Sequence, residues 1–276
     1  MGYDRNAHYE IEAFDVEYRQ VGDLTLLARI YRPKAPGTYP GLIEIHGGGW
    51  SVGTRMNHDE VNQRFASTGM VVAALDFRLS KQAPYPSQTT DCNYATRWFK
   101  ANAAELHVSD APIGAMGSSS GGHDILLSAW RPEDSRYVDA AVPNSDADAR
   151  LDYIICRWPV LDPYYRYKEQ IATGKDPSGT LAYLPDEATL KEGNPLLILE
   201  RGESIERPPV QIIQGTADTQ HPCELAERFA QLYKKQGGDI DLELFPDAPG
   251  LFMSNPGPNT DRAFEVMTAY VQRFTA

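Results

Sequence analysis

Short apolar runs alternate with amphipathic stretches along most of the chain. The runs are rich in β-branched residues and end at Gly, Pro or Asp, which is typical of buried strands. They lie at residues 42–45, 70–77, 112–116, 210–214 and 240–245. Between them, apolar residues recur at helical spacing, as in Leu225, Phe229 and Leu232. This alternation predicts an α/β protein with a doubly wound, mostly parallel sheet.

Two segments depart from this alternation. Residues 14–33 predict an N-terminal strand pair, because Gly22 and Asp23 form a turn between two strand-like runs. Residues 159–205 are rich in aromatic and charged side chains and predict a small lid over the sheet's carboxyl edge, where ligands bind in such folds. We expect residues 1–276 to form a single domain that includes this lid.

Charge and cysteine content narrow the class of partner. With 38 acidic and 26 basic side chains, the net charge of −12 repels phosphate backbones and anionic membranes, so we expect neither as a partner. Three widely spaced cysteines fit neither a disulfide framework nor a metal clip. The N-terminus is polar, which favours a cytoplasmic location. A small molecule is the expected substrate or ligand, and the sequence leaves a homodimer open.

A serine nucleophile is predicted by the stretch GSSSGG, residues 117–122. Gly117 and Gly121 flank Ser119 at the spacing that lets a serine stand on a tight turn between a strand and a helix. The run before it predicts a strand, and the apolar residues after it predict a helix. The hydroxyl of Ser119 should therefore be exposed at the sheet's carboxyl edge.

A glycine-rich loop, IHGGGW at residues 45–50, follows the strand at 42–45. Consecutive glycines let backbone N–H groups come close to a ligand and point at it together. A developing oxyanion needs such preset donors, each of which contributes about 3–4 kcal/mol. The loop therefore predicts an oxyanion hole opposite the serine.

These motifs resemble the hormone-sensitive-lipase-like branch of the α/β-hydrolase superfamily, which contains bacterial esterases and acetyl esterases. Residues 76–91, DFRLSKQAPYPSQTTD, keep the family's pattern between the two motifs. Residues 212–222, IIQGTADTQHP, are placed like the loop that carries the family's catalytic acid. The resemblance extends from about residue 24 to residue 274 and implies an α/β-hydrolase fold.

The resemblance also implies roles for individual residues. Ser119 would be the nucleophile, and Asp218 would be the acid that orients the base. His46 would hold the glycine loop, and His123 would pack under the serine turn. The oxyanion hole would consist of the backbone N–H groups of Gly48, Gly49 and Ser120.

The family's catalytic histidine is missing from its expected position, the loop after the strand at 240–245. Gly250 stands there, and none of the six histidines lies beyond His221. A serine hydroxyl needs a neighbouring imidazole to accept its proton. If the remaining geometry is intact, Gly250→His is expected to raise activity.

Four interpretations of this absence stay open. His221 could supply the base from the Asp218 loop, although the sequence favours an ordinary rim residue before a helix that begins at Pro222. The chain could bind a ligand without turnover, as plant gibberellin receptors of this fold do. It could act as a lyase or dehydratase in the same pocket. Gly250 could be an engineered replacement, but Leu251 also departs from the family pattern, which argues against a single substitution.

The sequence predicts a serine hydrolase with an incomplete or displaced triad. We expect it to cleave a small or aromatic neutral carboxylic ester through an acyl-enzyme on Ser119. No metal or cofactor is implied, because the histidines and acids lack metal-site spacing such as HExxH. Apolar pocket walls are expected from Trp50, Trp158, Tyr164, Tyr165 and Phe252.

Overall fold

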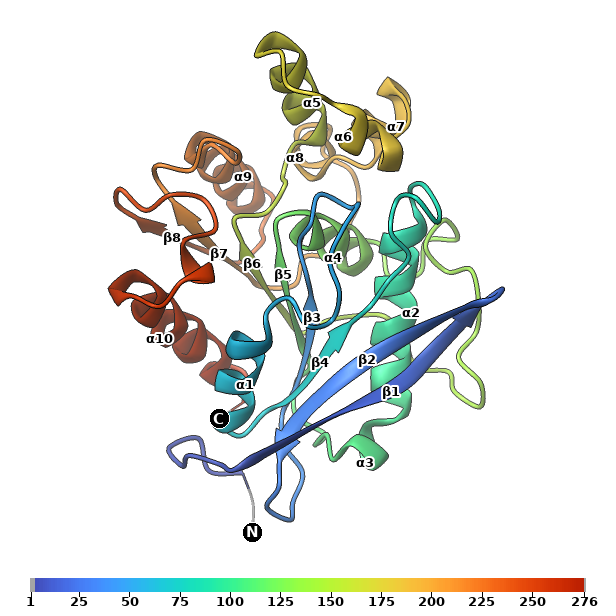
Figure 1. Cartoon of the computed structure of the whole chain (residues 1–276), viewed down its shortest axis with the longest axis vertical. Helices are drawn as coiled ribbons and strands as arrows, with labels where there is room; N and C mark the ends of the chain where they lie inside the picture. The colour runs from blue at the N-terminus through green and yellow to red at the C-terminus, as the bar shows by residue number, and fades with distance from the viewer. Residues whose placement is uncertain (1–2, 276) are drawn as a thin grey trace.

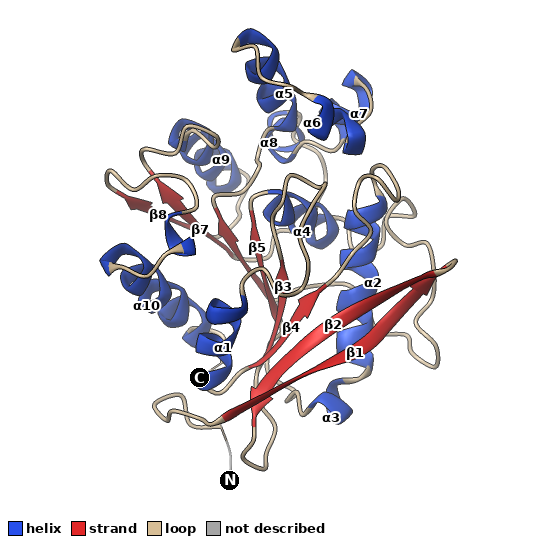
Figure 2. Cartoon of the chain, in the orientation of Figure 1, coloured by secondary structure: helices blue, strands red, loops and turns tan. Residues whose placement is uncertain are grey.

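A computed structural model describes residues 3–275, and its central feature is an eight-stranded sheet in the order β1-β2-β4-β3-β5-β6-β7-β8 (Figures 1 and 2). The strands are β1 (Ile11–Val21), β2 (Leu24–Pro33), β3 (Gly41–Ile45), β4 (Val71–Leu75), β5 (Gly114–Ser118), β6 (Tyr153–Arg157), β7 (Val210–Gly215) and β8 (Ile240–Phe245). The helices are α1 (Asp59–Ser67), α2 (Ser87–Ala101), α3 (Ala103–Leu106), α4 (Ser120–Trp130), α5 (Pro163–Ala172), α6 (Ser178–Tyr183), α7 (Glu187–Glu192), α8 (Pro195–Glu200), α9 (Cys223–Lys235) and α10 (Pro258–Gln272), with a 3-10 turn at Phe252–Ser254. Within the described chain, no helix has the length and apolar character needed to cross a bilayer.

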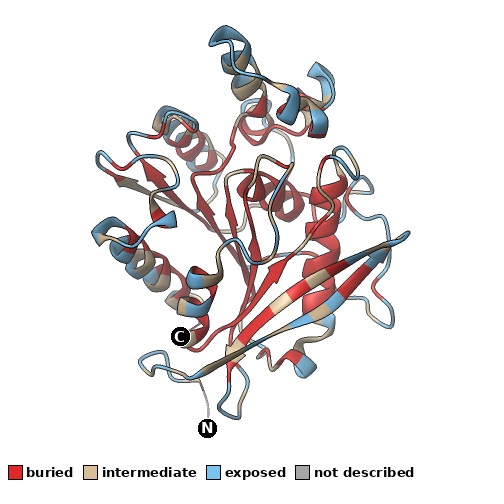
Figure 3. Cartoon of the chain, in the orientation of Figure 1, coloured by how far each residue is buried: buried red, intermediate tan, exposed pale blue. Residues whose placement is uncertain are grey.

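The sheet is parallel from β4 through β3 to β8, whereas β1 and β2 add an antiparallel edge. Every residue of β3, β4, β5, β6 and β7 is buried (Figure 3), as expected where helices cover both faces of a parallel sheet. The predicted doubly wound sheet is therefore confirmed. The N-terminal strand pair begins at Ile11, ahead of the predicted residue 14.

Helices pack on both faces of the sheet. On one face, α2, α4, α8 and α9 contribute buried side chains such as Trp98, Leu126 and Phe229. On the other, α1 and α10 contribute Phe65 and Met267. The two apolar clusters hold the parallel strands in place, so the carboxyl ends of β3, β5 and β7 meet along one edge (Figure 1).

The segment predicted as a lid, residues 159–205, contains α5, α6, α7 and α8 and extends beyond this edge (Figure 1). Apolar side chains from three of its helices pack against the body. Leu196 and Ile198 of α8 are part of the main core. Tyr183 of α6 stacks on Trp50 of the glycine loop with 5.6 Å between ring centroids, and Leu190 packs in the same cluster. The lid therefore borders the loops that carry the predicted catalytic residues.

Candidate active site

Ser119 lies on the sharp turn between β5 and α4, with backbone angles of φ 50° and ψ −119°. Such a conformation is strained for a residue with a side chain and persists only where the surroundings enforce it. The flanking glycines allow the turn to pack tightly. A Cβ at Gly121 would lie 2.4 Å from the carbonyl oxygen of Ile45, and one at Gly117 would lie 2.6 Å from that of Gly121. The motif is thus required sterically.

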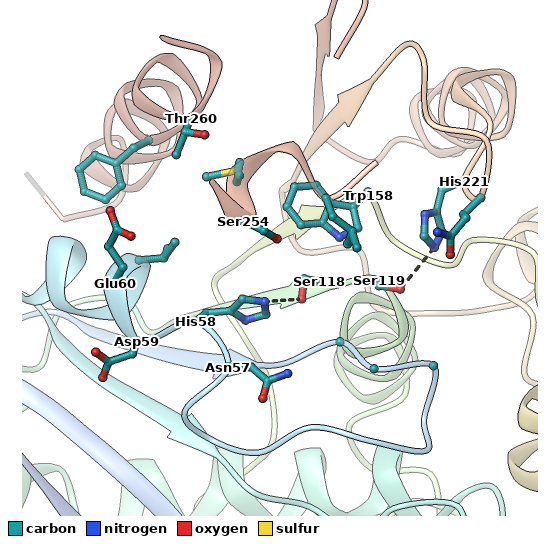
Figure 4. Close-up of a pocket in the computed structure, with 18 of the residues that line it drawn as sticks. Asn57, His58, Asp59, Glu60, Ser118, Ser119, Trp158, His221, Ser254 and Thr260 are labelled. Atoms are coloured by element: carbon teal, nitrogen blue, oxygen red, sulfur yellow. Dashed lines mark hydrogen bonds between the residues drawn. The ribbon is translucent and has the colours of Figure 1, made fainter. Parts of the chain in front are cut away.

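Ser119, His221 and Asp218 form a hydrogen-bonded series. Ser119 Oγ lies 3.3 Å from His221 Nε2 (Figure 4). His221 Nδ1 lies 3.1 Å from Asp218 Oδ2. A carboxylate only accepts, so Nδ1–H donates to Asp218 and Nε2 is left to accept from the serine. The serine contact is long for a hydrogen bond, which is common in catalytic sites without substrate.

The loop that carries Asp218 and His221 fixes both side chains. Asp218 Oδ1 accepts from the backbone N–H of Gln220 at 2.8 Å and of His221 at 3.0 Å. The amide of Gln214 donates to the carbonyl oxygen of His221 at 2.8 Å. Burial raises the pKa of Asp218, but the hydrogen bonds and charge of His221 lower it by a larger amount. The pKa therefore lies below its usual value. Asp218 is therefore ionised at neutral pH.

The interpretation of His221 as an ordinary rim residue, which the sequence favoured, is wrong. The side chain of His221 is only 7% exposed and lies between Asp218 and Ser119. Pro222 does precede a helix, α9, as predicted. Residues 218–221, before Pro222, form a turn around Asp218 Oδ1. His221 therefore points toward the serine instead of toward solvent.

Gly250 is explained by the position of Asp218. A Cβ at Gly250 would lie 2.7 Å from both Cγ and Oδ1 of Asp218, closer than such contacts occur. A side chain at 250 therefore requires the Asp218 carboxylate to move from its observed position. We therefore expect Gly250→His to lower activity, in contrast to the expectation from the sequence, because the larger residue would displace the Asp218 carboxylate.

The glycine loop lies against the serine turn. A Cβ at Gly48 would lie 1.8 Å from the carbonyl oxygen of Val52, and one at Gly47 would lie 3.1 Å from Ser119 Cβ. Gly48 and Gly49 both have positive φ, and both line the same cavity as Ser119. Ser120 is the first residue of α4, where backbone N–H groups have no partner within the helix.

Two buried histidines hold this loop. His46 Nδ1 lies 2.6 Å from the carbonyl oxygen of Gly47, and its ring stacks on Phe77 at 4.2 Å between centroids. His123 Nδ1 accepts from the indole of Trp50 at 3.3 Å, and its Nε2 donates to the carbonyl oxygen of Gly193 at 2.7 Å. His123 therefore ties the glycine loop to the lid.

A cavity of about 550 Å³ opens over Ser119. Of the five residues predicted to form its apolar walls, only Trp158 lines it. Tyr164 packs against the cluster of Trp50 and Tyr183, and Tyr165 lines a neighbouring cavity. Trp50 is 1% exposed and packs under the lid, and Phe252 lies behind Trp158 with 5.7 Å between ring centroids. The lining is more polar than predicted, and it includes Asn57, His58, Asp59, Glu60, Arg64, Arg166, Gln220, Ser254 and Thr260.

A second histidine faces the cavity, and no sequence motif pointed to it. His58 Nδ1 donates to Glu44 at 2.6 Å, and His58 Nε2 lies 3.4 Å from Ser118 Oγ, across the serine pair from His221 (Figure 4). Glu44 is fully buried and also pairs with Arg157 at 3.3 Å. Burial raises the pKa of Glu44, but His58 and Arg157 lower it to below its usual value. The sequence did contain one signal for such a partner, the glutamate inside the apolar run LIEI, because a buried carboxylate requires partners.

Comparison with known proteins places these features in a family. The BD-FAE family model matches residues 29–233. Carboxylesterase NlhH of Mycobacterium tuberculosis is 36% identical over 126 residues, which are 45% of this chain and 39% of NlhH. The probable carboxylic ester hydrolase LipM of the same organism is 25% identical over 223 residues, 78% of this chain and 50% of LipM. The chain thus aligns with half or less of the length of these relatives.

Solved structures resemble the whole chain. The apo form of Thermogutta terrifontis esterase 2 is 25% identical, with a TM-score of 0.77 and coverage of 96% of each chain. The form of this esterase phosphonylated by cyclosarin is 26% identical, with a TM-score of 0.76 and the same coverage. Because the family match spans most of the sequence, this chain belongs to the BD-FAE family and has the α/β-hydrolase fold.

Proposed function

We propose that this chain is a serine hydrolase that cleaves a small or aromatic carboxylic ester through an acyl-enzyme on Ser119. One observation carries the proposal: the hydroxyl of Ser119 lies 3.3 Å from an imidazole nitrogen of His221, whose other nitrogen is bonded to Asp218. Nucleophile, base and orienting acid are the parts that acyl transfer requires. The displaced triad uses His221 in place of a histidine at position 250.

The reaction proceeds in two halves. Ser119 Oγ attacks the ester carbonyl carbon while its proton passes to His221 Nε2. The tetrahedral oxyanion accepts hydrogen bonds from backbone N–H groups, those of Gly48, Gly49 and Ser120. The carbon–oxygen bond to the alcohol then breaks, and His221 returns the proton to the leaving oxygen. Water attacks the acyl-enzyme in the same way, which releases the carboxylic acid and restores the serine.

Asp218 stabilises the charge that develops on the base. When His221 accepts a proton, its Nδ1–H stays bonded to a carboxylate whose pKa is below the usual value. The carboxylate therefore remains ionised beside the imidazolium and holds the ring in the tautomer that exposes Nε2 to the serine. Its two backbone donors keep it in place during the transfer.

Similarity to named esterases supports ester hydrolysis over the alternatives. Relatives of this chain are named carboxylesterases, and a structure that resembles all of it is an esterase phosphonylated by cyclosarin. A receptor-like or lyase function was considered because Gly250 replaces the family's histidine. An imidazole nitrogen of His221 lies 3.3 Å from Ser119 Oγ, and this contact favours hydrolysis over either alternative.

A labelling experiment tests the proposal. Wild-type protein should react covalently with a fluorophosphonate probe and hydrolyse p-nitrophenyl acetate, with a burst of nitrophenol as the acyl-enzyme forms. Ser119→Ala should lose both properties, and Ser118→Ala serves as the matched control on the neighbouring hydroxyl. A folded wild-type protein that neither labels nor turns over the ester would refute the proposal, and so would labelling that survives in Ser119→Ala.

A further inference from the structure

Arg166 is a partly buried cation without a partner. It lies on lid helix α5 and lines the cavity over Ser119 together with Gln220 and His221. Its Nε is buried and makes no hydrogen bond, and no carboxylate among residues 3–275 pairs with its guanidinium. Arg64, the other arginine on the cavity, pairs with Asp261 at 3.1 Å. Among the described residues that line this cavity, Arg166 is therefore the arginine without a carboxylate partner.

An unpaired arginine at this position opposes folding. Removing a guanidinium from water costs free energy unless a partner compensates, and burial lowers the pKa of Arg166. The chain has 38 acidic side chains, so partners are not scarce in the protein as a whole. Asp218 attracts Arg166 through its charge, but its oxygens are already bonded to His221 and to two backbone amides. The guanidinium thus keeps its donors free for a ligand.

We propose that Arg166 binds a carboxylate carried by the alcohol half of the ester substrate. This inference rests on the proposed function and narrows it, and it replaces the neutral ester expected from the sequence. The planar fork of a guanidinium matches a carboxylate through two parallel hydrogen bonds. A single cation matches a monoanion, whereas a dianionic phosphate would leave excess negative charge in a cavity that also contains Asp59 and Glu60.

The position of Arg166 assigns the carboxylate to the alcohol half. Arg166 shares one wall of the cavity with His221, which protonates the departing alcohol oxygen. Asp59 and Glu60 lie beyond His58, at the end of the cavity away from His221 (Figure 4). They would repel a carboxylate on the acyl half if that half extends to their end. The favoured substrate thus carries its negative charge on the side of the leaving group.

Two acetate esters that differ in whether this carboxylate is free or masked as a methyl ester test the proposal. 4-Acetoxybenzoate and methyl 4-acetoxybenzoate share an acetyl group and a phenolic leaving group, but only the first has a carboxylate. The measured quantity is the ratio of their kcat/KM values. A charged hydrogen-bonded pair predicts a wild-type preference of roughly 10- to 100-fold for the anion, after correction for the intrinsic reactivity of each ester.

The variants separate substrate binding from other roles of the arginine. Arg166→Gln should bring the corrected ratio close to one, and Arg166→Lys should keep part of the preference because it keeps the charge. Arg64→Gln, the matched control on the same cavity, should leave the ratio as in wild type. An equal loss for both esters in Arg166→Gln would overturn the proposal, because the arginine would then act through Asp218 and His221.

A binding measurement distinguishes this inference from the proposed function. Calorimetry with the Ser119→Ala protein needs no turnover, and it should show 4-acetoxybenzoate binding at least 10-fold more tightly than its methyl ester. The added Arg166→Gln substitution should remove that difference. Hydrolysis without any preference between the esters would refute the carboxylate site alone. Absence of hydrolysis together with selective binding would refute the proposed function and retain the site.

Discussion

Replacing Gly250 by alanine should impair catalysis through Asp218. The new Cβ would lie 2.7 Å from Asp218 Cγ and Oδ1, whereas such atoms normally stay about 3.4 Å or more apart, so the carboxylate has to move by roughly 0.7 Å. Three hydrogen bonds of 2.8, 3.0 and 3.1 Å hold that carboxylate. A shift of this size carries at least one of them beyond hydrogen-bonding range.

The expected loss follows from the role of the acid. Mispositioning the orienting carboxylate of a serine triad lowers kcat by up to about 10⁴-fold. Gly250→Ala keeps the carboxylate in the site but displaces it, so we expect kcat to fall between about 10²- and 10⁴-fold with little change in KM. Gly250→His should be at least as impaired, because its ring needs more of the same space.

Steady-state hydrolysis of p-nitrophenyl acetate measures this loss. Gly257→Ala is the control, because a Cβ there meets no atom within 4 Å and its φ is not in the left-handed range. Thermal unfolding of both variants shows whether the fold is retained. A Gly250→Ala protein with kcat within threefold of wild type would refute the steric account, and higher activity in Gly250→His would refute the assignment of His221.

Two further predictions concern stability. Glu44→Gln should lower the free energy of unfolding at pH 7 by about 3–5 kcal/mol, because it leaves Arg157 buried without its charged partner. The pKa of Glu44 is lower in the folded state than its ordinary 4.5, so its contribution is present above that pH and is lost as the pH falls through the folded value. Urea unfolding between pH 3 and 7 should therefore show a shallower acid decline in Glu44→Gln, and an identical slope would contradict the pairing. Trp50→Ala should lower the free energy of unfolding by about 3–5 kcal/mol in the same assay, because its ring is 1% exposed and joins the glycine loop to the lid; a loss under 1 kcal/mol would count against that role.

The fold and part of the site could be predicted because their signals are local in sequence. A glycine on each side of Ser119 is needed because a Cβ at Gly121 would lie 2.4 Å from the carbonyl oxygen of Ile45, so the pattern has a steric reason of its own. Strands β3, β4 and β5 are buried along their whole length, and their apolar runs in the sequence therefore predicted the doubly wound sheet. The role of Asp218 as the acid was implied by the resemblance of residues 212–222 to the loop that carries the family's catalytic acid.

The remaining parts depend on contacts between segments far apart in the chain. His221 was assigned to the rim because nothing in the loop sequence shows that its ring turns toward Ser119, 102 residues away. The pairing of Glu44 with His58 joins a strand to the residue before α1, and it depends on how the loop between them folds back over 14 positions. Trp50 was predicted to line the cavity, but the ring of the lid residue Tyr183 stacks on it and covers it. Tertiary packing decided each of these positions.

The central claim is that His221 is the base that activates Ser119, and the turnover number of His221→Ala tests it most directly. The imidazole is 3.3 Å from the serine hydroxyl and is oriented by Asp218, so its removal should lower kcat for p-nitrophenyl acetate by about 10⁴- to 10⁶-fold. The circular dichroism spectrum should stay that of the folded protein. A folded His221→Ala variant whose kcat stays within tenfold of wild type would contradict the claim.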